Sequence, residues 1–441
     1  MHSKDVPEML NFLSLKDIGD LFSDIPPDVR VDGINIPAGI SEEKLLDEAS
    51  AIASLNRLPS ISFLGKGAYR RFIPSVVDHV SSIPQFQTAY TPYQAEISQG
   101  MLQALFEYQS VISDLTGMDM TNSSMYDGPT AAGEAARMAY RCSEGDTFLV
   151  PDIIDRNVLS VIQNYLHGLP VKITSYMVDR KTGKIDLADL ASKVDRNVFG
   201  IFAGIPNALG ILDDNVFRIQ EIKGNAMLVT YYDPISLGAV KPPGEYGTDI
   251  AVAEGQQLGI HLAMGGPYLG LFSFRKEYVR KSPGRLIGKT TDSDGNPAYV
   301  MTLQTREQHI RRDRAMSNIC TNQALMAISA LSYLSAMGSK GLRSVSAATL
   351  KNSRKLIDAL EKTGAGKYPF NAIPFSDVLF KMHLSSSDLA ARLGESGISG
   401  GIPARDLITF PEEGYHFFSV TELNGDEEIE ALAHALGGAT R

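Results

Sequence analysis

The sequence predicts an α/β protein with a large domain built on a mainly parallel sheet, helices on both faces of that sheet, and a smaller C-terminal α+β domain. Between residues 147 and 232, short runs of β-branched and aromatic residues alternate with amphipathic stretches. This alternation is typical of a parallel sheet that helices cover on both faces. After about residue 325 it gives way to an alanine- and serine-rich stretch, which indicates a second domain.

Length, charge and composition exclude several classes of protein. A chain of 441 residues exceeds the size at which one core keeps growing, so we expect at least two domains. The net charge of −10 argues against a nucleic-acid-binding surface. We expect no membrane segment and no metal site, because no apolar run has spanning length and the histidines lack ligand spacing. The two cysteines fit a reducing compartment, so we expect a soluble cytoplasmic protein.

The chain divides into three predicted segments. Residues 1–68 lack the strand–helix alternation and are interpreted as an N-terminal helical arm that packs on the body or on a partner subunit. Residues 69–334 form the large α/β domain, and residues 335–441 form the small domain. The elements follow from apolar periodicity. Strands are expected at 148–150, 171–178, 198–203, 227–232, 378–380 and 417–420, and helices at 157–167, 187–194, 217–222, 324–337, 350–362 and 386–395.

The first long helix of the large domain follows the loop 90–96. Its apolar residues recur in steps of three and four, which predicts one buried helical face. This stripe consists of Ile97, Met101, Leu105, Tyr108, Ile112 and Leu115. Gly117 is the expected C-terminal stop, since glycine adopts the left-handed conformation that ends helices.

An acid and an amide mark the expected ligand site at the carboxyl ends of the strands. Asp233 directly follows the strand 227–232, and Gln256 follows a second apolar run, ahead of the glycine-rich residues 265–267. Many pyridoxal-phosphate (PLP) enzymes pair such an acid with the pyridine nitrogen and form a Schiff base through a lysine near Gln256. An amide cannot form an imine. Lys241 is the nearby alternative, but it lies before the second strand and should point away from the site.

Two further residues predict a vestigial site. Asp127 precedes a helix at 131–141, whose N-terminus would normally attract a phosphate group. Pro129 removes one donor there and Asp127 places an anion in that position, so a helix cap is favoured over a phosphate site. We interpret Asp233 as a relic that caps a turn with Pro234. This chain alone is therefore not expected to be a PLP enzyme.

Long motifs spread over the chain carry a family resemblance. They are LFSDIPPDVR (21–30), TAYTPYQAEISQG (88–100), DLTGMD (114–119), KPPGEYGTDI (241–250), GGPYLGLF (265–272) and TREQHIRRDRAMSNICTNQAL (305–325). Together they resemble the glycine cleavage system P-protein, and more narrowly the alpha subunits of its two-subunit form. The resemblance implies a type I PLP fold. It also implies that a lysine-bearing beta subunit binds PLP covalently, and that glycine is decarboxylated and its aminomethyl group passes to the lipoyl arm of the H-protein. The alpha subunit would complete the partner's site in an α2β2 heterotetramer.

The resemblance also implies which residues reach the partner. Residues expected at the partner's site are Tyr90, Thr91, Tyr93, Gln94, Arg312 and Asn318, with Thr321 and Asn322 at the phosphate of the partner's PLP. Thr321 could instead be the N-cap of the next helix. The cationic residues His309, Arg311, Arg312 and Arg314 could bind an anion or form an intersubunit salt-bridge network. Arg71 stands where the family often carries histidine, which leaves its role open.

Two rival functions remain. The chain could be a catalytically dead homologue with a regulatory or scaffold role. It could also be an autonomous enzyme that uses Lys241 or another lysine.

Overall fold

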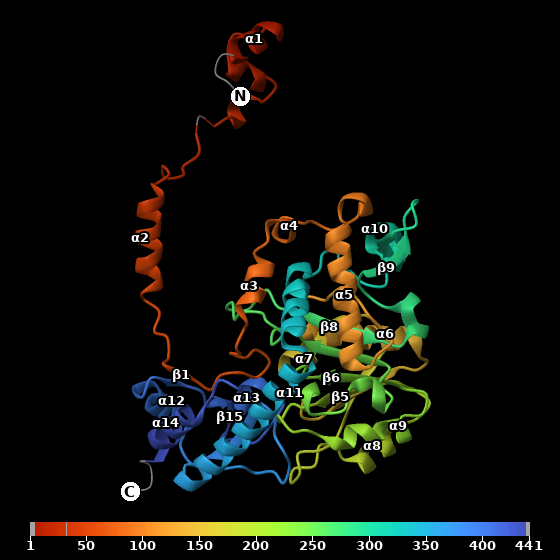
Figure 1. Cartoon of the computed structure of the whole chain (residues 1–441), viewed down its shortest axis with the longest axis vertical. Coiled ribbons are helices and arrows are strands. Elements are labelled where there is room, and N and C mark those ends of the chain that lie inside the picture. Colours follow the sequence, from red (N-terminus) through yellow and green to blue (C-terminus); the bar gives the residue numbers. More distant parts are fainter. Residues whose placement is uncertain (1–4, 32, 438–441) are drawn as a thin grey trace. The chain divides into compact units, whose positions relative to one another are not determined.

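The computed structural model describes residues 5–31 and 33–437, and it consists of two compact units, Met1–Leu58 and Pro59–Arg441 (Figure 1). The outer ends of the predicted arm and of the predicted C-terminal domain, residues 1–4 and 438–441, lie outside the described residues. The domain boundaries after residues 68 and 334 stay predictions.

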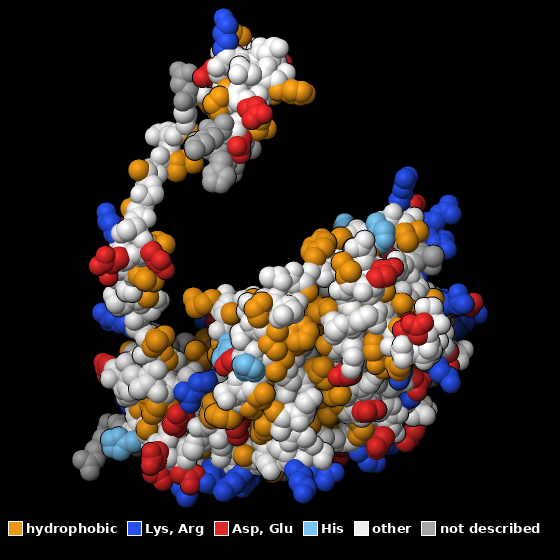
Figure 2. Space-filling model, turned by 45° about the horizontal axis from the view of Figure 1, so that its top comes forward, with side chains coloured by type: hydrophobic (Ala, Val, Ile, Leu, Met, Phe, Trp, Pro, Cys, Tyr) orange, Lys and Arg blue, Asp and Glu red, His pale blue; other side chains and the backbone are white. Residues whose placement is uncertain are grey.

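The N-terminal unit contains short helices and no buried side chain among its described residues. Its elements are α1 (Asp5–Phe12), the 3-10 helices η1 (Ile18–Phe22) and η2 (Pro27–Val29), and α2 (Glu42–Ala53). Ser41 begins α2 by accepting a hydrogen bond from the N–H of Lys44. Apolar side chains remain at the surface of the unit, where Figure 2 shows them in orange. A segment of this length is at the lower limit for burying a core of its own.

A seven-stranded sheet forms the centre of the second unit, in the order β2-β8-β7-β6-β5-β3-β4. Its strands are β2 (Met120–Thr121), β3 (Thr147–Pro151), β4 (Lys172–Tyr176), β5 (Val198–Ile205), β6 (Met227–Tyr232), β7 (Ile250–Glu254) and β8 (Gly270–Phe274). The strands β3 to β7 are parallel, whereas β8 and β2 run antiparallel to their neighbours. The predicted mainly parallel sheet is confirmed.

Helices cover both faces of this sheet, as predicted. They are α5 (Gln99–Thr116), α6 (Gly128–Cys142), α7 (Arg156–Leu166), α8 (Leu187–Lys193), α9 (Ile219–Ile222) and α11 (Ala324–Thr363). Successive residues of a strand point to opposite faces. Phe148 and Val150 therefore pack with α6 and α7, whereas Leu149 packs with α8 and α9. The helix expected at 217–222 is a 3-10 turn (η4, Asp214–Arg218) followed by one α-helical turn.

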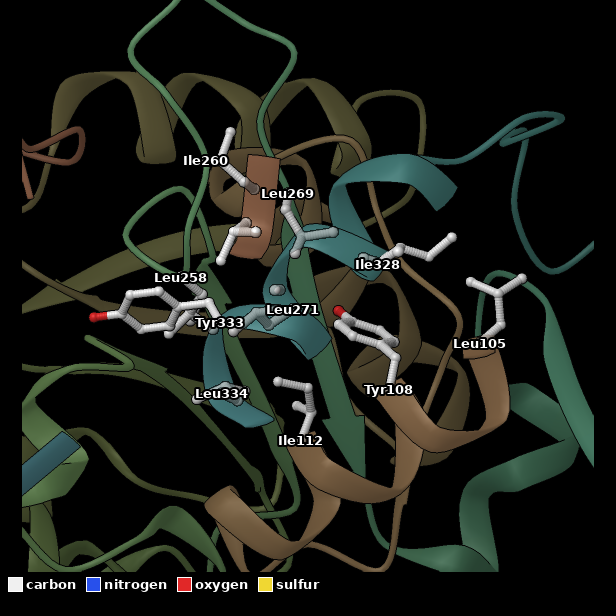
Figure 3. Packing of buried hydrophobic residues seen from close by; sticks show 14 of the residues in the cluster. Leu105, Tyr108, Ile112, Leu258, Ile260, Leu269, Leu271, Ile328, Tyr333 and Leu334 are labelled. Atoms are coloured by element: carbon white, nitrogen blue, oxygen red, sulfur yellow. The ribbon is translucent and has the colours of Figure 1, made fainter. Parts of the chain in front are cut away.

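The buried face of α5 packs against α11 and the start of β8. Figure 3 shows Tyr108 and Ile112 of α5 converging with Ile328 of α11 and with Leu271 of β8. The predicted stripe is wrong at Ile97, which is 80% exposed because a 3-10 turn (η3, Ala95–Ile97) precedes the helix. Gly117 ends α5 with φ 64°, as predicted.

The smaller C-terminal part is α+β, as predicted. An antiparallel sheet, in the order β11-β12-β15-β14, packs with α12, α14 and the second half of α11. Its elements are β11 (Gly366–Lys367), β12 (Asp377–Met382), α12 (Ser386–Glu395), β14 (Ile402–Pro403), α13 (Ala404–Leu407), β15 (Tyr415–Ser419) and α14 (Asp426–Gly437). The helix α11 reaches this part through a kink at Gly338, where φ is 58°.

Short elements complete the second unit. They are β1 (Ile61–Ser62), which pairs with β13 (Ile398–Ser399), then α3 (Ser75–Ser81), α4 (Pro84–Gln87), the hairpin β9 (Leu286–Thr291) and β10 (Pro297–Thr302), and α10 (Gln308–Arg311). No helix in the described parts of the chain is both long enough and apolar enough to cross a membrane.

Candidate functional site

A cavity opens at the carboxyl ends of the parallel strands, where ligands bind in open α/β sheets. Pro151 lines it at the end of β3, Pro206 after β5, Asp233 after β6, and Glu254 and Gln257 at the end of β7. Its empty volume is ≈ 820 Å³, part of which is open to solvent. A cavity therefore lies at the edge of the sheet where the site is predicted.

Gln256 is buried beside this cavity, and its amide group is fully engaged with backbone groups. Its Oε1 accepts from the N–H of Tyr69 at 2.8 Å. Its Nε2 donates to the carbonyl oxygens of Tyr69 at 3.2 Å and of Ile260 at 2.7 Å. Glutamine thus holds the segment around Tyr69 against the turn after β7. The side chain at the position predicted for lysine works as a structural clamp.

Replacing this clamp by an apolar side chain should cost stability. We expect Gln256→Leu to lower the free energy of unfolding by about 2–3 kcal/mol, since buried backbone groups of Tyr69 and Ile260 would lose their partners. Urea unfolding followed by circular dichroism measures it. Gln103→Leu on the exposed side of α5 is the control, where Gln103 contacts Glu107, and it should change little. Equal stabilities of the two variants would contradict the clamp.

Asp233 is held by protein groups on both of its carboxylate oxygens. Oδ1 accepts from the N–H groups of Ile235 at 2.8 Å and Ser236 at 3.0 Å, so Asp233 caps the turn, as predicted. Oδ2 accepts from Nε2 of Gln257 at 2.7 Å. Burial raises the pKa of Asp233, opposed by nearby Arg71 and by these donors. In PLP enzymes this acid would have to contact the pyridine nitrogen. Here the side-chain amide of Gln257 already bonds Oδ2 of Asp233.

Arg71 extends this contact into the smaller C-terminal part. Its Nε donates to Oε1 of Gln257 at 2.6 Å, and Gln257 in turn donates to Asp233. Its other nitrogens contact Thr349 at 3.2 Å, Glu422 at 2.6 Å and Ser376 at 3.1 Å. The side chain is 1% exposed. Arg71, whose role the sequence left open, is thus a buried link between the β7 turn and the C-terminal part.

Two acids of the chain cap the N-terminus of α6, and one of them, Glu254, also lines the cavity. The Glu254 carboxylate accepts from the N–H of Gly128 at 2.8 Å. Asp127 accepts from the N–H of Thr130 at 2.7 Å, which confirms the predicted helix cap. A Cβ on Gly128 would lie 2.2 Å from the Tyr231 hydroxyl and 2.9 Å from Cβ of Glu254. Glycine is required there because both side chains approach the backbone this closely.

The contacts of Gln256, Glu254 and Asp233 show that PLP does not fit the cavity of this chain. A covalent link needs an amine at Gln256, a phosphate needs free N–H groups at α6, and the ring nitrogen needs a free Asp233. The structure shows an amide, a helix end filled by Glu254, and an acid bonded to Gln257. Lys66 is the one lysine among the described residues that line the cavity, and its Nζ lies 3.7 Å from Asp155. Lys241 is exposed and does not line the cavity.

The loop around Tyr93 and the segment 305–322, far apart in the sequence, meet at Arg285. The Arg285 guanidinium lies over the Tyr93 ring at 5.4 Å, donates to the Tyr93 hydroxyl at 3.1 Å, and donates to the carbonyl of Cys320. Glu307 lies 3.5 Å from Arg285 and 3.6 Å from His309. His309 packs edge-on against Tyr93. The structure therefore brings these two predicted partner-facing segments together.

Most of the residues predicted to reach the partner are accessible. Tyr90, Tyr93, Gln94, Arg312, Asn318 and Thr321 are exposed, and Thr91 and Asn322 are half-buried. Asn322 donates to Ser123 at 2.8 Å. The alternative of Thr321 as a helix N-cap is wrong, because α11 begins at Ala324 after Gln323, with no side-chain cap. None of these residues lines the cavity at the strand ends. Their roles at a partner's site stay predictions.

The sequence pattern singles out neither Glu254 nor Gln257, and it leaves the role of Arg71 open. Glu254, Gln257 and Arg71 make the contacts that fill the cavity edge. The signal for Glu254 was an acid at the end of an apolar run, two residues before Gln256. No periodicity identifies Gln257 or Arg71, because their partners lie far away in the sequence.

The fold and the position of the cavity define the class of the protein. The structure is similar to the apo structure of a cysteine desulfurase from Thermococcus onnurineus, with a TM-score of 0.63 and 17% identity over 91% of this chain and 99% of that one. At this identity the likeness shows the fold alone. The chain has the type I fold of PLP-dependent enzymes.

Closer relatives identify the family. The family model of the glycine cleavage system P-protein matches residues 1–436. The chain is 53% identical to the probable glycine dehydrogenase (decarboxylating) subunit 1 of Thermoplasma acidophilum, covering 97% of this chain and 98% of that protein. It is 50% identical to the protein of the same name from Thermoplasma volcanium, covering 98% and 99%. A crystal structure of an inhibitor-bound glycine decarboxylase (P-protein) has a TM-score of 0.90 and 33% identity, covering 99% and 98%. The chain belongs to the glycine cleavage system P-protein family.

Proposed function

We propose that this chain is the subunit of a two-subunit P-protein that holds no covalent PLP, and that it completes the site of a lysine-bearing beta subunit. With that partner it decarboxylates glycine, and the aminomethyl group passes to the lipoyl arm of the H-protein. The working assembly is an α2β2 heterotetramer. Bound to the partner, PLP supplies the electron sink for the decarboxylation.

One observation carries this proposal: the buried amide of Gln256, at the position predicted for the Schiff-base lysine, is bonded to backbone groups through both its oxygen and its nitrogen. The names of the relatives as subunit 1 support a division of labour between two chains. The exposure of Tyr90, Gln94 and Thr321, away from the chain's own cavity, supports a role at another subunit's site.

Reconstitution tests the proposal. The chain, the lysine-bearing partner and their mixture are assayed with PLP and H-protein for glycine–bicarbonate exchange. We expect strong exchange only in the mixture, together with a complex of two copies of each chain in light scattering. Exchange by this chain alone would make it an autonomous enzyme. A complex whose exchange does not depend on this chain would favour a scaffold or regulatory role instead.

Thr321 gives a sharper prediction for the assembled complex. A hydroxyl and a backbone N–H at this exposed position suit a phosphate group. We expect Thr321→Val to weaken PLP retention by the complex about tenfold, through the loss of one hydrogen bond to a charged group. Thr321→Ser keeps the hydroxyl and should retain PLP like the parent chain. Dialysis against cofactor-free buffer, followed by absorbance of the bound PLP, measures the difference. Unchanged retention in Thr321→Val would exclude this contact.

A further inference from the structure

The N-terminus of α6 retains no free backbone donor in its first turn. Gly128 donates to Oε2 of Glu254 at 2.8 Å, and Pro129 has no N–H group. Thr130 donates to Asp127, and Ala131 donates to the Asp127 carbonyl at 3.0 Å. A helix N-terminus binds phosphate through such N–H groups. Here the donors are consumed within the chain, next to Glu254, which lines the cavity.

Glu254 does more than cap this helix, because its second oxygen holds the turn after β7 and the start of β8. Oε1 accepts from the N–H of Gln256 at 2.9 Å and from that of Leu269 at 3.2 Å. One carboxyl group therefore joins the end of β7, the glycine-rich loop before β8 and the first turn of α6. A phosphate group binds in a comparable way, through several oxygen acceptors directed at backbone N–H groups.

We propose that the Glu254 carboxyl group is a built-in substitute for a cofactor phosphate, which keeps the cavity ordered without cofactor and closes it to phosphorylated ligands. Loss of the lysine is then only one of two independent barriers to PLP on this chain. Restoring an amine at Gln256 leaves the phosphate position blocked by Glu254. This inference concerns the chain's own cavity and holds whether or not the partner assignment is correct.

Chemical rescue by inorganic phosphate tests the substitution directly. Glu254→Ser removes the carboxylate and leaves a small hydroxyl beside the freed N–H groups. We expect its melting temperature to fall below that of the parent chain and to rise again with added inorganic phosphate, beyond the effect of chloride at equal ionic strength. The parent chain should respond to phosphate and chloride alike. If phosphate stabilises Glu254→Ser no more than it stabilises the parent chain, the proposal is overturned.

Glu134→Ser is the matched control. Glu134 is also buried and lies on α6 itself, but it bonds Ser317 and lies away from the helix N-terminus. Its removal should destabilise the chain without any specific rescue by phosphate. Specific rescue of this variant would show that phosphate fills any vacated acid position, which would contradict the assignment of Glu254.

A second experiment uses PLP itself as the probe. Gln256→Lys and Gln256→Lys with Glu254→Ser are each incubated with PLP, reduced with borohydride and mapped by peptide mass spectrometry. We expect at least tenfold more adduct on the introduced lysine in the double variant. With pyridoxal, which has no phosphate, the two variants should form similar amounts. Equal PLP adduct in both variants would show that Glu254 does not block the phosphate position.

Discussion

Arg71→Met is expected to lower the free energy of unfolding by about 3–5 kcal/mol. The side chain is buried and bonded at once to Gln257, Thr349, Ser376 and Glu422. Methionine fills much of the volume but leaves the Glu422 carboxylate, 12% exposed, without its cation. Removing one partner of a buried pair costs more than the pair contributes, because the remaining charge stays desolvated. Urea unfolding by far-UV circular dichroism measures the loss, since the chain has no tryptophan.

The neighbouring Arg70 provides the control for this prediction. Its side chain is 42% exposed and pairs with Glu428 at 3.0 Å. Exposed ion pairs contribute about 0–1 kcal/mol, so Arg70→Met should cost far less than Arg71→Met. Equal losses in the two variants would contradict the role of Arg71 as the buried link between the β7 turn and the C-terminal part.

Stability is expected to fall as the pH rises from about 4.5 to 7. Burial raises the pKa of Glu254 to about 7, against the N–H groups of Gly128, Leu269 and Gln256 that lower it, with Asp127 adding a further rise. Burial also raises the pKa of Glu134 to about 7, although Ser317, Arg141 and Arg137 oppose the rise. The folded state therefore holds protons that the unfolded state has released. This stabilising contribution is complete below the unfolded pKa and is lost as the pH passes the folded pKa.

The expected magnitude is about 3 kcal/mol for each group over this range. Unfolding free energies measured at several pH values in the parent chain and in Glu254→Gln with Glu134→Gln isolate the two groups. The double variant should lose this part of the slope, since an amide does not titrate here. A slope that is the same in both proteins, or that has the opposite sign, would contradict the raised pKa values.

Local periodicity made most of the fold predictable. The strands β3, β5 and β6 and the helix α5 each carry a clear apolar pattern and Gly117 ends α5 as expected. The errors occur where one turn decides the boundary. Ile97 continues the periodicity of α5 by spacing, but the 3-10 turn before Gln99 directs it into solvent. The strand pairing of β1 with β13 joins residues more than 300 positions apart, and two-residue strands carry no pattern.

The candidate site was predictable only where the residue type at a single position indicates its chemical role. Gln256 is singled out because the sequence pattern predicts a Schiff-base lysine at this position, and Asp127 because an acid precedes a helix. The other hydrogen bonds of the site join residues that only the tertiary fold brings together. Gln257 meets Arg71 across 186 positions and Glu254 meets Gly128 across 126, distances over which a single sequence gives no register.

We propose that this chain holds no covalent PLP and that the amine comes from another subunit. The most direct measurement incubates the isolated chain and the lysine-bearing partner separately with PLP, followed by borohydride reduction and peptide mass spectrometry. We expect a stoichiometric adduct on one lysine of the partner and none on this chain, including Lys66 at the cavity wall and Lys241. A stoichiometric adduct on a single lysine of the isolated chain would contradict it.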